Sequence, residues 1–394
     1  GGCDEGPHYW DYGAGKVFDC LELMESATEG RFDVYGRRLI SEMGRYIYRA
    51  YIDGSYFLSI ADTGGKHILS GYLEFRYGRK IEDERLAALG AWAVAGRRGE
   101  GDYCVSGNLG RRLQALWSLR ELSEAIEKGA AEPPLVRDVW LDDKDLQFMA
   151  ARCREGSRKG LYLAAWASHN GQSHNHNDVG NFIVYADGCP IIIDAGVEAY
   201  TLKTFGPHRY ELWAMQSAYH NLPTVGGVMQ KDGREFAARD VEYKKGKSFA
   251  RLRMDIAGAY PPEAGLGSWV RTVRLNRGEE ENISVVDSYE LKKARGELTL
   301  SLITPCEVTS ARPGLLTLKE VRAGRDRQPV HVQMTYDPDK LLARTLEKIP
   351  IHSHHEPRFD MRAIWGTDHL TRVVLEARAP GLKNKWELVF TRSQ

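Results

Sequence analysis

The hydrophobic pattern of this chain changes once, and that change limits the folds open to it. In residues 36–51 and 109–128, apolar residues recur three and four positions apart, which predicts amphipathic helices. The segment KGAAEPPLVRD at 128–138 then places two adjacent prolines where a helix would have to continue. Short runs rich in β-branched residues follow, such as 282–291 and 385–392. Consecutive strands without helices between them predict an antiparallel sandwich.

Length and composition narrow the class further. A chain of 394 residues exceeds what one ordinary core organises, so we expect two domains. Lys+Arg and Asp+Glu balance at 54 each, so the chain has no net charge that would attract nucleic acid or a membrane. An anionic partner would have to be held by local arginines. No apolar run approaches the roughly 18 residues of a membrane helix. The cysteines are spread singly, which predicts free and mostly buried thiols at Cys3, Cys20, Cys104, Cys153, Cys189 and Cys306.

Histidines are concentrated in one part of the chain, where five of the twelve fall within 52 residues: His169, His174, His176, His208 and His220. His174 and His176 are two apart, which on a strand would put both side chains on one face. The apolar segment PIIIDAG is expected to be a strand that ends at Asp194. Two imidazoles and a carboxylate suit a divalent ion such as zinc. The alternative is that these side chains bond the backbone and one another without metal.

Several sequence blocks resemble the heparinase II/III-like polysaccharide lyases. HNGQSHNHNDVGNF, IIIDAGVEAY and HRYELWAMQSAYHN resemble successive blocks of the family's sandwich domain, and GGCDEGPHYW resembles the segment before one of its last toroid helices. The resemblance implies an α+β multidomain fold, with the C-terminal part of an (α/α) toroid in 1–131 and an antiparallel multi-sheet β-sandwich in 132–394. It also implies β-elimination on an anionic uronic-acid polysaccharide, such as heparan sulfate, chondroitin or hyaluronan, and a periplasmic or secreted location.

The resemblance also assigns roles to residues. Tyr9 in PHYW matches the catalytic tyrosine, and His174 in SHNHND matches the catalytic histidine. His176, Asp194 and His220 are then expected to hold one structural divalent ion, zinc. A tyrosine, with a reference pKa of about 10, can serve as base and as acid if nearby positive charge favours its phenolate. Residues expected to bind substrate are Glu5, His8, Tyr12, Tyr200 and Arg209.

Other interpretations of these residues stay open at this point. Tyr9 would also suit an interfacial aromatic with its hydroxyl bonded, and Tyr12 competes with it for the catalytic role. Arg209 would suit a uronate or sulfate through its bidentate fork, or a structural ion pair to Asp or Glu. The cluster IHSHHE, with His352, His354 and His355, is interpreted as a solvated loop.

One family feature lies outside this sequence. Family members carry an Asn or His upstream of the tyrosine segment that helps neutralise the substrate carboxylate. We therefore expect either a fragment that partners a further toroid segment, or a substitute such as His8. A homo-oligomer is left open. The alternatives from other classes are a carbohydrate-binding module with an architectural metal, and a metal-dependent hydrolase with an activated water.

Overall fold

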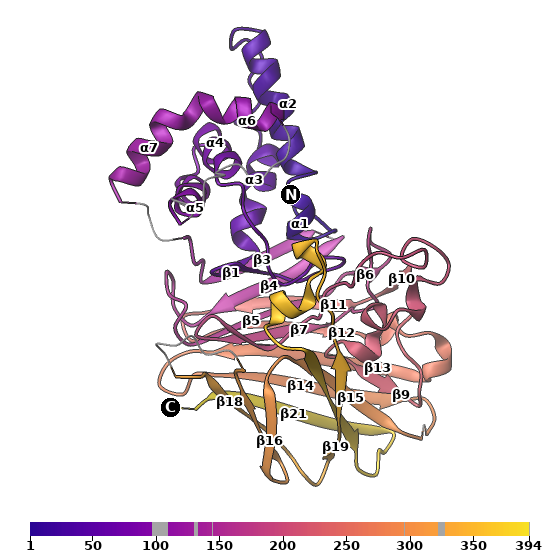
Figure 1. Ribbon diagram of the computed structural model, residues 1–394. Coiled ribbons are helices and arrows are strands. Elements are labelled where there is room, and N and C mark those ends of the chain that lie inside the picture. The colour runs from indigo at the N-terminus through magenta and orange to yellow at the C-terminus, as the bar shows by residue number, and fades with distance from the viewer. Residues whose placement is uncertain (97–108, 130–132, 144, 295, 322–327, 394) are drawn as a thin grey trace.

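The computed structural model of the protein describes residues 1–96, 109–129, 133–143, 145–294, 296–321 and 328–393. Helices dominate its N-terminal part (Figure 1). They are α1 (Pro7–Trp10), α2 (Ala14–Ala27), α3 (Arg38–Arg49), α4 (Tyr72–Lys80), α5 (Glu84–Ala95), α6 (Leu109–Ala115), the 3-10 turn η1 (Leu116–Ser118) and α7 (Leu119–Glu127), with a small hairpin of β1 (Tyr51–Asp53) and β2 (Tyr56–Phe57) between α3 and α4. The helices predicted in 36–51 and 109–128 are confirmed, the second one interrupted by η1.

Helices α4 and α5 lack the periodic pattern that identified the others, because they are buried on more than one side. In α4, seven of the nine residues are buried, so no polar stripe marks a solvent face. The two helices also approach each other closely at glycine. A Cβ on Gly90 would lie 2.3 Å from the backbone nitrogen of Phe75, and one on Gly78 would lie 2.3 Å from that of Ala87. This pair of helices therefore depends on glycine at both positions.

Three large antiparallel sheets follow, which confirms the β part of the expected fold class. The first has the order β3-β4-β5-β7-β8, with β3 (Asp138–Asp143), β4 (Leu146–Arg152), β5 (Leu161–Trp166), β7 (Phe182–Ala186) and β8 (Cys189–Ile192). The eight-stranded sheet has the order β11 (Arg239–Lys245), β12 (Phe249–Asp255), β13 (Leu266–Asn276), β14 (Asn282–Leu291), β21 (Lys383–Arg392), β18 (His331–Tyr336), β17 (Leu315–Lys319) and β16 (Glu307–Arg312). The four-stranded sheet is β19 (Leu341–Pro350), β20 (His369–Ala377), β15 (Leu298–Thr304) and β9 (Pro223–Val225). A two-stranded pair, β10 (Gly233–Ala237) with β6 (His169–Asn170), and a short helix α8 (Met361–Trp365) complete the described elements.

The five-stranded sheet is covered on both faces, and β5 shows how. Leu161, Leu163 and Ala165 point into a core shared with the eight-stranded sheet. Tyr162 and Trp166 alternate with them and pack into the second core, which the helices supply. Side chains of a strand point alternately to opposite faces, so both sets are buried and β5 reads as an unbroken apolar run. Figure 1 shows the resulting layers, with helices on one side of this sheet and the larger sheets on the other.

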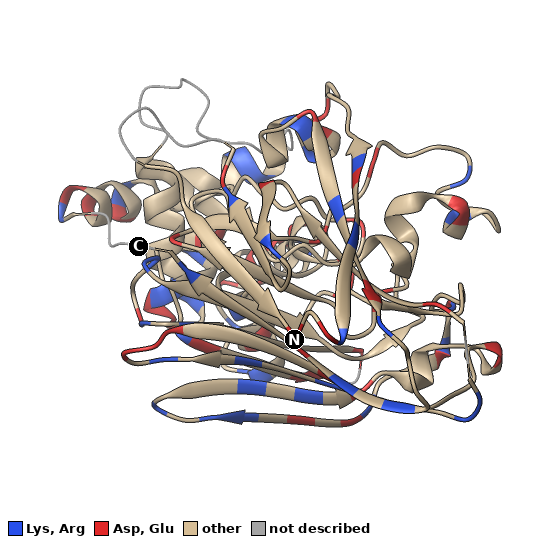
Figure 2. Ribbon diagram, turned by 90° about the horizontal axis from the view of Figure 1, so that it is seen from below, with Lys and Arg blue, Asp and Glu red and all other residues tan. Residues whose placement is uncertain are grey.

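The boundary between helices and sheets lies between Glu127 and Asp138. A division into domains at residue 131 stays a prediction, since residue 131 is outside the described residues. Basic and acidic residues are interspersed along the ribbon seen from below, as the balanced composition predicts (Figure 2). Among the described helices, none combines the length and apolar character that crossing a bilayer demands.

The cysteine prediction holds in part. Cys153, Cys189 and Cys306 are buried thiols, whereas Cys3 is half-buried and Cys20 is exposed. Cys104 lies outside the described residues. The three buried thiols belong to the core between the sheets, where they pack as small apolar side chains.

Candidate active site and metal centre

Tyr9, His174 and Tyr200 come from distant parts of the chain and meet. Tyr9 lies on α1, His174 in the loop between β6 and β7, and Tyr200 in the segment after β8. The hydroxyls of Tyr9 and Tyr200 are hydrogen-bonded, and the Tyr200 hydroxyl lies 3.4 Å from His174 Nδ1. The rings of Tyr9 and His174 have centroids 4.8 Å apart. All three side chains are half-buried, so two phenols and an imidazole form one cluster that solvent still reaches.

The expectation that His174 and His176 share a strand is wrong. Strand β6 ends at Asn170 and β7 begins at Phe182, and a loop joins them. His174 has a φ of 53°, a left-handed conformation that a strand does not use. Side chains replace the strand ladder in bonding this backbone, as where the Asp178 amide donates to Asn170 Oδ1 at 3.1 Å.

Both histidines nevertheless contact one side chain, Asp62, which was not predicted from the sequence. Asp62 lies between β2 and α4 and is 2% exposed. His174 Nδ1 lies 2.7 Å from its Oδ2, and His176 Nε2 lies 3.1 Å from its Oδ1. The guanidinium of Arg209 donates to both oxygens, at 2.6 and 3.2 Å. Burial would raise the pKa of the Asp62 carboxyl, but the bonds from His176 and Arg209 outweigh it and hold that pKa below its ordinary value.

An ionised Asp62 sets the tautomers of both imidazoles. A carboxylate only accepts hydrogen bonds, so His174 must donate through Nδ1 and His176 through Nε2. In the neutral rings the lone pairs then sit on His174 Nε2 and His176 Nδ1. The first nitrogen is free to take a proton, and the second faces His220. One buried carboxylate therefore orients the proposed base and a proposed metal ligand together.

Asp62→Ala is expected to destabilise the protein by about 3–5 kcal/mol, because it leaves the buried Arg209 cation without its partner. Urea denaturation followed by circular dichroism measures the loss. Glu211→Gln is the matched control, since it removes the carboxylate of a pair with Lys203 in which both side chains are 53% exposed. Such a surface pair contributes at most about 1 kcal/mol. Equal losses in the two variants would refute the central role of Asp62.

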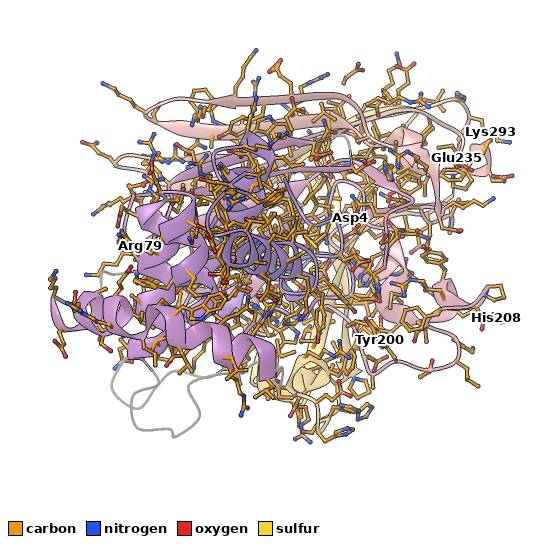
Figure 3. The ribbon with its side chains drawn as sticks, turned by 90° about the horizontal axis from the view of Figure 1, so that it is seen from above. Asp4, Arg79, Tyr200, His208, Glu235 and Lys293 are labelled. Atoms are coloured by element: carbon orange, nitrogen blue, oxygen red, sulfur yellow. The ribbon has the colours of Figure 1, made fainter. Side chains whose placement is uncertain are left out.

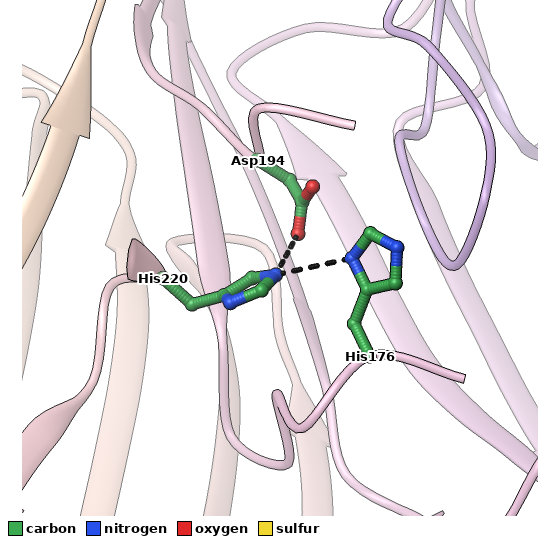
Figure 4. A group of neighbouring side chains, drawn as sticks. All are labelled: His176, Asp194 and His220. Atoms are coloured by element: carbon green, nitrogen blue, oxygen red, sulfur yellow. Dashed lines mark hydrogen bonds and ion pairs between the residues drawn. The ribbon is translucent and has the colours of Figure 1, made fainter. Parts of the chain in front are cut away.

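His176, Asp194 and His220 form a group that could hold a metal ion, with ligand atoms within 4.8 Å of one another (Figure 4). His220 Nε2 lies 3.3 Å from His176 Nδ1 and 3.3 Å from Asp194 Oδ2. Ligands at the usual zinc distances of about 2.0–2.1 Å in a tetrahedral site are about 3.3–3.4 Å apart, so the two separations from His220 Nε2 fit. Each of the three residues is 1% exposed.

The outer atoms of this triad are already engaged, as in established metal sites. His176 donates to Asp62, and His220 Nδ1 donates to the carbonyl of Gln216 at 2.9 Å. Both inner nitrogens then carry lone pairs, which is the tautomer that a metal requires. A proton competes with the ion. Burial lowers the pKa of His220, but the Asp194 carboxylate has the larger, opposite effect, and the resulting pKa is about 9. Without metal, an imidazolium–carboxylate pair therefore forms.

The remaining predicted site residues lie at different distances from the cluster. Glu5 Oε1 is 3.9 Å from His174 Nε2, and Tyr12 is 70% exposed with its ring 6.3 Å from that of Tyr9. His8 bonds the carbonyl of Lys66 at 2.7 Å. Burial lowers the pKa of His8 to about 3, so at pH 7 its ring is neutral and offers a substrate carboxylate no positive charge.

Arg209 is committed to the protein interior. Besides its bonds to Asp62, its guanidinium donates to the carbonyls of Asn175 at 3.0 Å and Thr204 at 2.9 Å, which uses four of its five N–H groups. These are the contacts of the structural ion pair that the sequence left as an alternative, and substrate binding by Arg209 stays a prediction. His208 is exposed and pairs with Glu211, at the edge of the view in Figure 3.

Two further side chains next to the cluster were not predicted. Phe205 is 67% exposed, and its ring centroid lies 5.6 Å from that of His174 and 4.9 Å from that of Tyr200. Arg358 follows the loop of His352, His354 and His355, and its guanidinium lies 5.6 Å from the centre of the Tyr200 ring. In that loop His352 and His355 are exposed, as expected, and His354 is half-buried against Phe359. No local motif marks Phe205 or Arg358, because both reach the cluster only through the tertiary fold.

A family comparison covers much of the sheet-forming part of the chain. Residues 160–340 match the family described as heparinase II/III-like, C-terminal. These residues are a heparinase II/III-like C-terminal domain. The resemblance seen in the sequence is thereby confirmed. The heparinase II/III-like domain contains His174, the candidate metal group and Tyr200, whereas Tyr9 and Asp62 lie upstream of the matched residues. The sequence has no match among curated proteins.

Solved structures share the fold of the chain that contains the heparinase II/III-like domain. The heparan sulfate lyase HepC from Pedobacter heparinus is 13% identical, with a TM-score of 0.65 over 99% of this chain and 52% of its own. The heparinase III BT4657 gene product is 12% identical, with a TM-score of 0.66 over 100% and 52%. A further heparinase III is 14% identical, with a TM-score of 0.60 over 99% and 54%. This chain spans about half the length of these structures.

Proposed function

We propose that this chain carries the catalytic centre of a polysaccharide lyase that cleaves uronate-containing glycosaminoglycans by β-elimination. The observation that supports this best is the contact of Tyr9, Tyr200 and His174. Tyr9 and Tyr200 are 191 positions apart in the sequence, yet these three side chains, all of types that can transfer protons, form one cluster. The heparinase II/III-like domain and the lyase names of the similar structures point the same way. Glycosaminoglycans such as heparan sulfate, chondroitin or hyaluronan are the proposed substrate class.

The reaction explains the residue types. A base removes the hydrogen on carbon 5 of the uronate as a proton. The electron pair of the broken C–H bond forms the double bond between carbons 4 and 5. The bond from carbon 4 to the glycosidic oxygen breaks, and an acid protonates that oxygen. The carboxylate next to carbon 5 must be neutralised by a cation or by strong hydrogen bonds, since negative charge develops there in the transition state.

Tyr9 and His174 divide the proton transfers in this proposal. Burial raises the pKa of Tyr9 more than the bond from Tyr200 lowers it, so Tyr9 is protonated in the free protein and suits the acid. His174 Nε2 carries the lone pair once Nδ1 donates to Asp62, and it suits the base. In glucuronate, the hydrogen and the leaving oxygen lie on the same side of the ring. Tyr9 would there lose its hydroxyl proton to solvent, accept the proton of carbon 5 as a phenolate, and pass that proton to the leaving oxygen, which restores the phenolate.

We further propose that zinc occupies the group of His176, Asp194 and His220 and braces the loop that carries His174, two residues from His176. An ion there would supply a fixed positive charge that joins the loop to β8 and to His220. The 1% exposure of each ligand argues against a metal-activated water and so against the hydrolase alternative. The helices from α1 to α7 are proposed to be the C-terminal part of an (α/α) toroid.

An assay on a panel of glycans tests the lyase proposal. Elimination leaves an unsaturated uronate, which we expect to detect by its ultraviolet absorbance together with new reducing ends. New reducing ends without that absorbance would mean hydrolysis. Binding without either product would mean a carbohydrate-binding module, and both of these results contradict the proposal.

His174→Ala is expected to slow cleavage of iduronate-type substrates by about 100-fold or more, whereas glucuronate-type substrates retain a larger part of their rate. In iduronate the hydrogen and the leaving oxygen lie on opposite faces, so a base separate from Tyr9 is required. Initial rates on a matched pair of epimeric substrates give the comparison. His208→Ala is the control, an exposed histidine outside the cluster. An equal loss on both epimers would contradict this division of labour.

A further inference from the structure

The segment before α8 reaches the cluster from the far end of the sequence. The ring of Phe359, which is 5% exposed, lies 4.8 Å from the ring of Tyr200 and fixes this segment against it. Arg358 therefore lies beside Tyr200, with its guanidinium 5.6 Å from that ring and 4.4 Å from the ring of Phe359. In Figure 3, the label of Tyr200 lies beside the pale yellow helix α8, which follows this segment.

Arg358 is more exposed than Arg209 and has fewer described bonds within the protein. The Arg209 side chain is 10% exposed and bonds Asp62 and two carbonyls. The Arg358 side chain is 40% exposed, and its described ion pair is with Glu356, which is 46% exposed, at 3.0 Å. A pair open to water on both sides is weak, so an anionic ligand can displace Glu356 at little cost.

We propose that Arg358 binds the oxyanion, carboxylate or sulfate, of the sugar residue that lies against Tyr9 and Tyr200. This inference rests on the proposed function, which it deepens by naming the group that holds the negative charge of the substrate. The planar fork of an arginine pairs with either oxyanion through two parallel bonds. The guanidinium lies over the ring of Phe359, and its described hydrogen bond runs from Nε to the exposed Glu356 at 3.0 Å.

The charges around the cluster support this role. Burial raises the pKa values of Tyr9 and Tyr200, and the positive charge of Arg358 lowers both. A cation at this place also attracts a polyanion to a cluster that has two carboxylates beside His174, Asp62 at 2.7 Å from Nδ1 and Glu5 at 3.9 Å from Nε2. His8 is neutral and Arg209 is paired, so neither competes with Arg358 for the substrate.

Binding of defined oligosaccharides to the 394-residue chain tests the inference. All variants carry Tyr9→Phe so that no turnover occurs, and isothermal titration gives Kd. The probes are an unsulfated glucuronate oligosaccharide, a sulfated one, and the carboxyl-reduced form of each. Arg358→Gln is expected to weaken binding of the unsulfated uronate about 10-fold, and Arg358→Lys less. Arg362→Gln, an exposed arginine four residues on, is the control and is expected to leave Kd unchanged.

A double-mutant comparison identifies the group that is bound. If Arg358 holds the carboxylate, carboxyl reduction weakens binding to the Arg358 protein about 10-fold but adds nothing to Arg358→Gln. If it holds sulfate, the coupling appears between the sulfated and unsulfated probes instead. Either coupling supports the inference. Unchanged binding in Arg358→Gln, an equal loss in Arg362→Gln, or no binding by the Arg358 protein would overturn it.

The lyase proposal is read separately, from the unsaturated product formed by the chain with Tyr9 intact. Coupling at Arg358 without that product would refute the lyase and leave the anion site standing. The product without coupling would leave the lyase standing and refute the role of Arg358.

Discussion

Tyr9→Phe is expected to lower the rate of cleavage of every uronate substrate by about 100- to 10,000-fold, the range that a positioned acid or base contributes. The substitution removes one oxygen atom and keeps the ring that lies 4.8 Å from His174. Substrate binding should therefore persist while kcat falls. Both epimers lose activity, because Tyr9 protonates the leaving oxygen in either case. Steady-state rates of unsaturated product, with KM measured beside kcat, check this.

Tyr12→Phe is the matched control for Tyr9→Phe. Tyr12 lies three residues further on, is 70% exposed, and has its ring 6.3 Å from that of Tyr9. We expect it to retain nearly full kcat. A large loss in Tyr12→Phe with full activity in Tyr9→Phe would exchange the roles of the two residues. Tyr200→Phe removes the hydroxyl that bonds Tyr9 and should give an intermediate loss, since it acts through Tyr9.

Removal of the metal is the second change with a large expected effect. We expect about one equivalent of zinc in the purified protein and none in His176→Ala. An ion at 100 times its Kd stabilises the folded state by about 2.7 kcal/mol. At about 2–4 °C per kcal/mol, His176→Ala or treatment with a chelator should lower the melting temperature by roughly 5–10 °C. Elemental analysis and thermal denaturation measure the two quantities.

His208→Ala is the matched control for the metal site, because His208 belongs to the same histidine-rich segment but is exposed and pairs with Glu211. It should keep both the metal and the melting temperature. Restoring zinc to the chelated protein should restore its melting temperature, whereas zinc should not rescue His176→Ala. A protein that contains no metal and melts unchanged with chelator would refute the site, and the pair of His220 with Asp194 would then be an ordinary buried ion pair.

Local patterns in the sequence predicted those features whose cause is local. The helix over α3 follows from its periodic apolar positions, and the strands of the larger sheets follow from their alternation. The family resemblance, rather than spacing alone, singled out His176, Asp194 and His220 as a candidate metal group, and the structure brings these three side chains together. Helix α4 was not predicted from the apolar periodicity, because burial on most sides removes the contrast between apolar and polar faces.

The tertiary structure alone decided which partners these residues have. Asp62 contacts His174 across 112 positions and Arg209 across 147, and no spacing rule connects residues so far apart. That contact sets the tautomers of two histidines and withdraws Arg209 into the interior, although its fork would suit a substrate equally well. Arg358 is an ordinary loop arginine in the sequence, and the packing of Phe359 on Tyr200 brings it to the cluster. The sequence by itself thus determined the residue types available for chemistry, whereas burial and long-range packing determined which charges remain free to act.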